Sequence, residues 1–384
     1  MPVAARKKVL ICWVYHPAFG HVVEAIEAAA SVVQANPDAE VSLVLAQAPG
    51  THLLQYAPWI KDCWIIDLTS DLDRQVKAVP ADWDHVVFPV SLYYEPEKWY
   101  RGSLLSCNQL LMQHLHGRLG EQFERAAVRC GAALEMPAFP NVRLQLPEDA
   151  RAWAQGHRSG SGPVFALLLS SSIGATHAPR IGMWHRIIRR LSCEHPGAEF
   201  WVVGMSHRGR FGLTSERGRR WQIEGLQKLG QVRLLLDVGL ERQLSLMEAA
   251  DVFVSPHTGF AFLASCVGTP WLCLSGGAWP DAPLGNTPFW FSMPKCEKFP
   301  CWGREKLQCR IRRRLKQPVA CFDGLLSERL EEITCAAAEL VAGTCSFRDS
   351  MLTWQRRSRE LGVDTSRLVR LHEFLQQTAE SVGD

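Results

Sequence analysis

The stretch AADVFVSPHTGFAFLASCVGTPWLCLSG, residues 249–276, contains the alternation of elements that decides the fold. A short apolar run, Val252–Ser255, is followed by a turn with proline and glycine, a small-residue helix at Ala261–Val267 and a second apolar run at Trp271–Ser275. Neither run alternates apolar with polar residues, which is typical of strands buried on both faces. Two such strands joined by a helix predict a parallel β-α-β unit with a right-handed crossover.

The same alternation recurs along most of the chain. Further strand-like runs are Lys8–Tyr15, Glu40–Ala46, Cys63–Leu68, His85–Val90, Val164–Ser170, Glu199–Gly204 and Val232–Asp237. Apolar residues recur at helical spacing in Val22–Ala35, Met183–Glu194 and Glu241–Ala250. The sequence therefore predicts an α/β protein with doubly wound parallel sheets.

A polar, glycine-rich break at Gln155–Pro163 separates the two alternating halves and is typical of a linker. We therefore expect an N-terminal domain at residues 1–158 and a second domain at residues 159–345. Amphipathic helices are expected at residues 346–384, packed back on the first domain. Doubly wound domains bind ligands at the carboxyl ends of their strands, so the expected site is the cleft where the two domains face each other.

The composition excludes several classes of protein. A chain of 384 residues with 47% hydrophobic residues, 21% charged residues and a net charge of +3 is not a disordered protein. The sequence contains no run of about 18 uncharged apolar residues, so no membrane-spanning helix is predicted. The first apolar run leads into His16 and Pro17 rather than a small-residue cleavage site, which favours a buried strand over a signal peptide. The 13 cysteines, mostly single and in apolar runs, indicate reduced thiols and a cytoplasmic protein.

The turn Pro256–Gly259 carries the strongest chemical signal. Free N–H groups at the start of a helix that follows a strand bind anions, and a diphosphate is the natural ligand. Gly259 permits close backbone approach and Thr258 supplies a hydroxyl. An ordinary strand-to-helix turn is the alternative interpretation. Walker, G-x-G-x-x-G and H-E-x-x-H motifs are absent from the sequence, which removes the main support for ATPase, dehydrogenase and zinc-protease functions.

Residues 249–276 resemble the donor-site motif of the heptosyltransferase-like glycosyltransferases of family 9. The shared residues are Ala250, Asp251, Thr258, Gly259, Leu263, Ala264, Gly268, Thr269, Pro270 and Gly276. His257 stands where the family has aspartate, and Phe262 where it has histidine. In the family these two positions touch the donor sugar and phosphates, so the resemblance implies that this chain holds a different sugar or holds it differently.

The resemblance extends over about residues 160–325. Leu167–Ser172 with Arg180 is similar to the family's strand and hydroxyl-rich phosphate turn, which implies that Ser171, Ser172 and Arg180 bind the donor diphosphate, together with His257, Thr258 and Gly259. Gly204 and Leu240 lie in segments that resemble those around the family's nucleoside, which implies that both bind the nucleoside. The resemblance implies a GT-B fold of two Rossmann-like domains, a nucleotide-diphospho-sugar donor, inversion at the anomeric carbon, no cofactor and no metal for binding the diphosphate.

The expected general base is His21, because it follows the first strand and opens the first helix. Family 9 has aspartate at this place, whereas a Gly-His turn resembles that of the natural-product glycosyltransferases, whose histidine is the base. A neutral imidazole is a competent base near neutral pH. Helix capping or phosphate binding is the alternative for His21, His16 is a weaker candidate base, and Glu24 lies one helical turn on, where it can orient the ring or be solvated.

For two further features an interpretation without a specific ligand is favoured. Cys296, Cys301, Cys309 and Cys321 have irregular spacing, so a cleft-shaping loop of reduced thiols is favoured over a zinc site. The basic run at residues 310–316 is interpreted as a solvated or membrane-peripheral face rather than a nucleic-acid site, since the net charge is only +3.

The sequence therefore predicts an inverting, metal-independent glycosyltransferase that moves a sugar from a nucleotide-diphospho-sugar to an acceptor hydroxyl. The acceptor is a lipopolysaccharide or other cell-surface glycan, lipid-linked or not, or a small natural product. A nucleotide-sugar epimerase on the same fold and a non-catalytic nucleotide-sugar binder are the alternatives.

Overall fold

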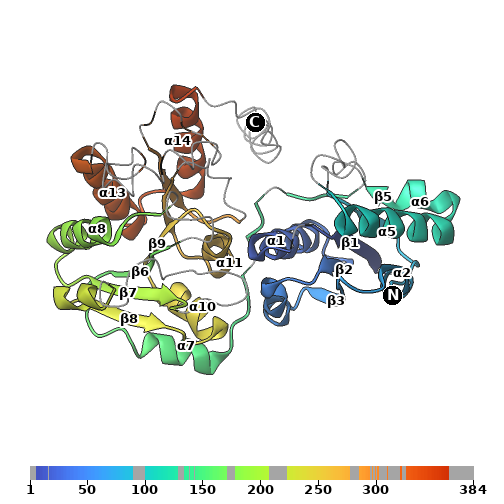
Figure 1. Cartoon of the computed structure of the whole chain (residues 1–384), viewed down its shortest axis with the longest axis horizontal. Helices are drawn as coiled ribbons and strands as arrows, with labels where there is room; N and C mark the ends of the chain where they lie inside the picture. Colours follow the sequence, from blue (N-terminus) through green and yellow to red (C-terminus); the bar gives the residue numbers. More distant parts are fainter. Residues whose placement is uncertain are drawn as a thin grey trace. The chain divides into compact units, whose positions relative to one another are not determined.

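The computed structural model forms two compact units, Met1–Gln145 and Leu146–Asp384. It describes residues 6–15, 17–89, 100–128, 134–137, 139–141, 143–170, 178–206, 223–276, 285–294, 296, 299, 301, 309, 321 and 326–362. Each unit is built on its own parallel sheet (Figure 1).

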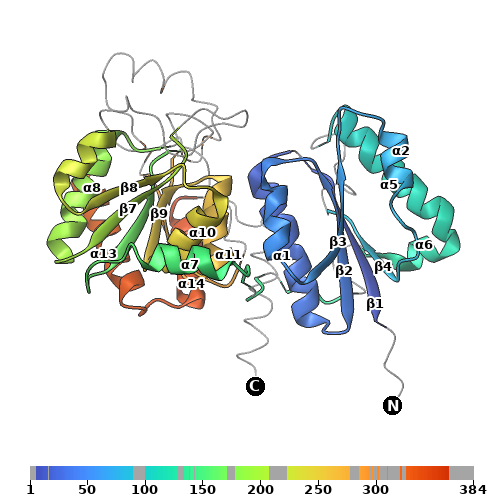
Figure 2. The same ribbon diagram turned by 90° about the horizontal axis from the view of Figure 1, so that it is seen from below.

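The first unit has a sheet of strand order β3-β2-β1-β4-β5. Its strands are β1 (Lys7–Trp13), β2 (Ala39–Ala46), β3 (Ile60–Ile66), β4 (His85–Val87) and β5 (Ala127–Val128), with the 3-10 turn η1 (Pro49–Tyr56) between β2 and β3. Helix α1 (Phe19–Ala35) covers one face, and α2 (Leu72–Lys77), α5 (Ser103–Leu119) and α6 (Glu121–Ala126) cover the other (Figure 2).

The core of this unit follows from the period of two in its strands. Leu10 and Cys12 point to the face covered by α5 and pack with its fully buried Cys107 and Leu111. Asn108 on the same helix is also buried, and its side-chain amide donates to the Val14 carbonyl at 2.8 Å. This bond fixes the segment that follows β1.

The second unit has a sheet of strand order β11-β10-β9-β6-β7-β8. Its strands are β6 (Val164–Leu168), β7 (Glu199–Gly204), β8 (Val232–Leu236), β9 (Val252–Pro256), β10 (Trp271–Leu274) and β11 (Phe289–Ser292). Its helices are α7 (Glu148–Gln155), α8 (Ile181–Glu194), α10 (Leu240–Ala249), α11 (Leu263–Val267), α13 (Leu326–Val341) and α14 (Phe347–Glu360), with the 3-10 turns η2 (Gly225–Leu229) and η3 (Gly259–Phe262). Helices α8 and α13 lie on one face of the sheet, and α7, α10 and α11 on the other (Figures 1 and 2).

The strand order shows where each sheet reverses direction. In the second unit β6, β7 and β8 succeed one another outward, and the chain then returns to place β9 on the other side of β6. In the first unit β1, β2 and β3 succeed one another, and β4 then pairs with the free side of β1. Such a reversal leaves a crevice between the two central strands at their carboxyl ends. The crevices therefore lie beside β6 and β9, and beside β1 and β4.

The amino edge of the second sheet is closed by a network of charged groups. Glu199 accepts hydrogen bonds from the backbone N–H groups of Ser159 and Gly160 at 2.8 and 2.7 Å. The Arg158 guanidinium donates to Asp251 at 2.6 Å, and Asp251 also accepts from the backbone N–H at the start of β6. Burial raises the pKa of the Glu199 carboxyl, but these hydrogen bonds outweigh it and hold the pKa below its ordinary value.

This network explains why the chain divides after Gln145, before the expected boundary at residues 158 and 159. The glycine-rich segment is packed on the second sheet, and a Cβ on Gly162 would lie 2.2 Å from the Gly197 carbonyl oxygen. Helix α7 also belongs to this unit, because Arg151 pairs with Glu248 on α10 at 2.9 Å.

The C-terminal helices were expected on the first domain, but α14 packs in the second unit. The Phe289 N–H on β11 donates to the Ser350 hydroxyl at 3.0 Å, and Arg357 donates to the Phe291 carbonyl at 2.9 Å. Residues 363–384 of the expected tail lie outside the described residues.

Candidate functional site

The turn Pro256–Gly259 lies at the carboxyl end of β9, on the crevice beside β6. Strands β6 and β9 pair in parallel, with Leu167 opposite Val254. Thr258 has an extended backbone and is 4% exposed, and its hydroxyl does not cap the turn that follows. The structure thus places Thr258 two residues beyond the end of β9.

The helix after this turn differs from the expectation. Gly259 opens a 3-10 turn of 4 residues, and α11 itself has 5 residues. So short a helix has a weak dipole, because the dipole sums over aligned peptides. An anion here would be held by the groups of the turn rather than by a helix dipole.

His257 and Phe262, the two departures from the family motif, lie against each other. Their ring centroids are 5.4 Å apart with planes at 85°. Trp271 contacts both rings, with its own centroid 6.3 Å from that of His257 and 5.9 Å from that of Phe262. The positions that carry polar chemistry in the family are here joined in one aromatic cluster.

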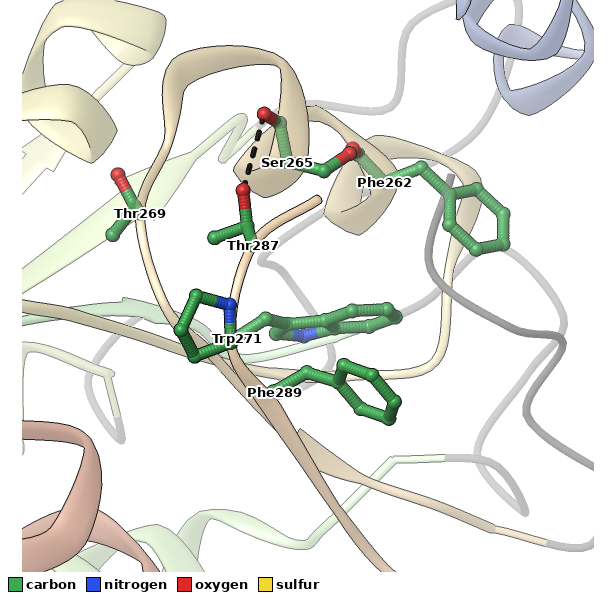
Figure 3. Close-up of a pocket in the computed structure, with 7 residues that line it drawn as sticks. Phe262, Ser265, Thr269, Trp271, Thr287 and Phe289 are labelled. Carbon is green, nitrogen blue, oxygen red and sulfur yellow. Dashed lines mark hydrogen bonds between the residues drawn. The ribbon is translucent and has the colours of Figure 1, made fainter. Parts of the chain in front are cut away.

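A small cavity lies behind this cluster (Figure 3). Its lining is Phe262, Ser265, Thr269, Trp271, Thr287, Pro288 and Phe289. The hydroxyl hydrogens on its wall are already donated: Thr269 to the Met247 carbonyl at 2.7 Å and Thr287 to the Ser265 carbonyl at 3.5 Å. Its volume of about 10 Å³ holds one water molecule, so it is not a sugar site.

The other side of the crevice is formed by the end of β6. Ser171 and Ser172 lie outside the described residues. Ser170, which precedes them, is 1% exposed, and its hydroxyl has no hydrogen-bond partner among the described residues. Arg180 is the residue that precedes α8, without a side-chain capping hydrogen bond, and Trp184 in the first turn of that helix donates to the Leu169 carbonyl at 3.1 Å. This bond holds the start of α8 near the end of β6.

Gln243, which was not identified from the sequence, links the ends of β7 and β8 through hydrogen bonds. Gly204 has a φ of 112°, which favours glycine, and its N–H donates to the Gln243 side chain at 2.7 Å. The Gln243 amide donates in turn to the carbonyls of Gly204 and Leu235 at 3.1 and 3.0 Å. Gly204 can therefore serve a ligand through close backbone approach rather than through its N–H. Leu240 is the first residue of α10 and is half-buried.

Asp237, directly after β8, begins the segment that the family resemblance assigns to the nucleoside. It is the one non-glycine residue in the described ranges with a positive φ, 59°. Its carboxylate accepts from the Ser206 N–H at 2.9 Å and from the Ser206 hydroxyl. An acidic residue at a strand end, followed by Val-Gly, was the available sequence signal.

The crevice of the first unit contains His21. It lies in the first turn of α1, and its Nδ1 is 2.9 Å from Glu24 Oε2. Tyr15, two residues beyond β1, lies edge-on to the imidazole with ring centroids 4.3 Å apart. The structure thus joins His21 and Glu24 as the sequence suggested, while His16 lies outside the described residues.

The ends of β10 and β11 are held by Arg329, which lies on α13 and is 6% exposed. Its guanidinium donates to the carbonyls of Ser275 and Ser292 at 2.7 and 2.8 Å, and to the Cys321 carbonyl. Burial lowers the pKa of Arg329 to about 10, so it stays charged at neutral pH. No sequence pattern marked this residue.

The cysteine loop was the other open question. Cys309 packs against the buried Cys321, and burial, with Cys296, Cys309 and Cys301 nearby, raises the pKa of the Cys321 thiol to about 12. Within the described part of the chain, no three histidine, cysteine or acidic side chains are placed to hold a metal ion. All of the basic run at residues 310–316 lies outside that part. No helix among the described residues is long and apolar enough to span a bilayer.

Comparison with known proteins establishes the fold. No family model matches the sequence, and no curated protein matches it. Among solved structures, the chain is similar to the Escherichia coli ADP-heptose LPS heptosyltransferase II, with 13% identity over 88% of this chain and 99% of that one and a TM-score of 0.54. It is also similar to a glycosyltransferase family 9 protein from Veillonella parvula, with 12% identity over 88% and 98% of the two chains and a TM-score of 0.51.

These similarities confirm the predicted fold. The chain has the GT-B fold of the heptosyltransferases and of family 9 glycosyltransferases, with two Rossmann-like units and two parallel sheets.

Proposed function

We propose that this protein is a glycosyltransferase that binds a nucleotide-diphospho-sugar on the second unit and an acceptor hydroxyl on the first. One observation carries the proposal. The Pro256–Gly259 turn, with the buried Thr258, lies at the crevice between β6 and β9. The Ser170 hydroxyl, which has no partner within the described ranges, lies at the same crevice. A buried hydroxyl without a partner is costly, and a diphosphate would supply an acceptor for Ser170 as well as one for Thr258 at the turn.

The diphosphate is the leaving group of the proposed reaction. Negative charge develops on it as the bond to the anomeric carbon breaks, and Arg180, Thr258, Ser170 and the N–H groups of the Gly259 turn stabilise that charge. Ser171 and Ser172, which follow Ser170 in the sequence, and His257, which precedes Thr258, are further proposed contacts to the diphosphate. The positive charge of Arg180 allows this binding without a metal ion.

The acceptor is activated in the first unit. His21 takes the proton of the acceptor hydroxyl as the oxygen attacks the anomeric carbon, and Glu24 accepts a hydrogen bond from the other ring nitrogen. The products are the glycosylated acceptor, the nucleoside diphosphate and the protonated imidazole, which releases its proton to water. A single displacement of this kind inverts the anomeric centre.

In this proposal the nucleoside binds beside Gly204 and Leu240, at the carboxyl ends of β7 and β8. The similar E. coli enzyme is named for ADP-heptose and lipopolysaccharide. For this chain the donor class is a nucleotide-diphospho-sugar, and the acceptor is a hydroxyl of a cell-surface glycan or of a small natural product.

A thermal-shift experiment tests the donor site. UDP, GDP, ADP and dTDP, with their common sugars, are added to the wild type, Thr258→Val and Thr258→Arg, each with and without a chelator. Thr258→Val removes the hydroxyl at nearly constant volume, and Thr258→Arg fills the turn. The exposed Thr344→Arg, in the same unit, is the matched control.

We expect one nucleotide to raise the melting temperature of the wild type and of Thr344→Arg. The same nucleotide should raise the melting temperature of Thr258→Val by a smaller amount and leave that of Thr258→Arg unchanged. The shift should survive the chelator. No shift with any nucleotide at millimolar concentration would overturn the proposal, and equal shifts in all variants would exclude this turn as the site.

A further inference from the structure

We propose that Tyr15 is a positioning residue for His21: its ring, together with the Glu24 carboxylate, holds the imidazole in one plane and one tautomer. The proposal rests on the proposed function only for its catalytic consequence. The geometry itself is a property of the free protein.

Tyr15 forms a wall against the imidazole. The two rings are perpendicular, with planes at 84° and centroids 4.3 Å apart. Such an edge contact between rings is favourable and directional. Tyr15 is itself supported by Tyr100, which is fully buried, with centroids 5.3 Å apart and planes at 66°. The wall is therefore anchored in the core of the first unit.

Glu24 fixes the tautomer. His21 and Glu24 lie three residues apart on α1, so their side chains share one face of the helix. A carboxylate only accepts hydrogen bonds, and a bond of 2.9 Å therefore places the hydrogen of the neutral ring on Nδ1. The lone pair is left on Nε2, which has no hydrogen-bond partner within the described residues.

The hydrogen bond to Glu24 and the ring contact with Tyr15 restrict different motions of the imidazole. A single hydrogen bond at Nδ1 lets the ring pivot about that bond, and Nε2 would then sweep an arc. The perpendicular Tyr15 ring blocks this pivot. Nε2 thus has a fixed direction before any acceptor arrives, and preorganisation of this kind is what a general base requires.

The phenol of Tyr15 does not compete as a base. Burial raises the pKa of the Tyr15 hydroxyl, and the negative charge of Glu24 raises it further. It remains protonated at neutral pH, so the contribution of Tyr15 comes from its ring. A matched pair of variants separates the contribution of the ring from that of the hydroxyl: Tyr15→Phe keeps the ring, whereas Tyr15→Leu removes it.

Nitrogen-15 NMR of the histidine rings tests the proposal without any substrate. The signals of His21 are assigned by comparison with His21→Gln, at a pH where the ring is neutral. We expect Nδ1 to be protonated and Nε2 unprotonated in the wild type and in Tyr15→Phe. In Tyr15→Leu and in Glu24→Gln both signals should move toward the values of an exposed histidine, where the tautomers exchange.

An NMR fingerprint spectrum shows whether each variant is folded. If Tyr15→Leu is not folded, Tyr15→Met takes its place, because methionine fills the space without a planar ring. A wild-type ring with the hydrogen on Nε2, or unchanged His21 signals on removal of the Tyr15 ring, would overturn the proposal. The NMR signals of His21 do not depend on transferase activity. Failure of the proposed function would therefore be seen separately from failure of this proposal.

Once a donor and an acceptor are in hand, the same variants give a kinetic test. Tyr15→Leu should lower kcat by about tenfold or more, with the donor KM unchanged, because a misdirected base slows the chemical step but not donor binding. Tyr15→Phe should keep wild-type kcat. An equal loss in both variants would assign the effect to the hydroxyl and contradict the proposal.

Discussion

His257 lies edge-on to Phe262, with ring centroids 5.4 Å apart and planes at 85°, and both rings contact Trp271. The family motif has aspartate and histidine at these two positions. In this chain the two departures are therefore one structural change, since each replacement supplies the contact surface of the other. A carboxylate in place of His257 would face aromatic rings instead of a polar partner.

The first prediction concerns this aromatic cluster. Phe262 is 7% exposed, so Phe262→Ala should lower the free energy of unfolding of the second unit by about 3 kcal/mol, through lost burial and the cavity left beside Trp271. Chemical denaturation followed by tryptophan fluorescence measures it. The half-buried neighbour Phe260 is the control, and Phe260→Ala should cost less. Equal costs would show that the cluster adds nothing to Phe262.

The second prediction concerns the link between the ends of β7 and β8. Gln243 is 4% exposed and makes three hydrogen bonds to backbone groups of Gly204 and Leu235. Gln243→Ala should cost about 2–4 kcal/mol, because it leaves these buried groups unpaired. Urea unfolding measures the loss, and the exposed Gln227→Ala should change the unfolding midpoint little. A neutral Gln243→Ala would mean that water replaces the amide.

The third prediction concerns the buried cation on α13. Arg329→Met removes the donor to three carbonyl groups, at Ser275, Ser292 and Cys321, and should cost about 3 kcal/mol or more. Arg329→Lys keeps the charge but has fewer donors in a different geometry, so it should recover only part of this loss. Thermal unfolding of both variants is the measurement. Full recovery by lysine would show that charge alone matters.

The fourth prediction concerns acid stability. The pKa of Glu199 is lower in the folded protein than its ordinary value of 4.5, because the hydrogen bonds that it accepts outweigh its burial. Its carboxylate therefore stabilises the fold above about pH 4.5, and this stabilisation is lost as the pH falls further. Glu199→Gln should lower the free energy of unfolding by about 2 kcal/mol at neutral pH.

The difference between wild type and Glu199→Gln should shrink below pH 4.5, as measured by urea unfolding across a pH series. Glu194→Gln, which alters an exposed pair with Arg190, is the control and should show no such trend. A difference that stays constant with pH would show that Glu199 is not the group that titrates.

The strands were the most predictable part of the fold. Val252–Ser255 and Trp271–Ser275 became β9 and β10 with ends shifted by one residue, because strands buried on both faces leave an uninterrupted apolar signal. The edge strands β5 and β11 were missed. β5 has two residues, and Phe289–Ser292 is as short as a loop and becomes a strand only through its pairing with β10.

The positions of the candidate residues in the fold were predictable where these residues adjoin a strand in sequence. Thr258, Gly259 and His21 follow the central strands directly, so their place in the crevices depends on local sequence alone. Gln243 and Arg329 could not be found in this way, since they reach strand ends that lie elsewhere in the chain. The division of the chain after Gln145, and not at the glycine-rich segment, depends on long-range contacts of the same kind. A glycine-rich segment resembles a linker until its long-range bonds to Glu199 are seen.

The network at the amino edge of the second sheet has a consequence for how this protein can change. Glu199, Asp251 and Arg158 secure the sheet at the edge opposite to the strand ends where ligands are proposed to bind. Loops at the carboxyl edge can therefore vary without loosening these bonds. Such a division makes the unit an evolvable scaffold, in which new sugar preferences can be explored by mutation while a reserve of stability is kept elsewhere.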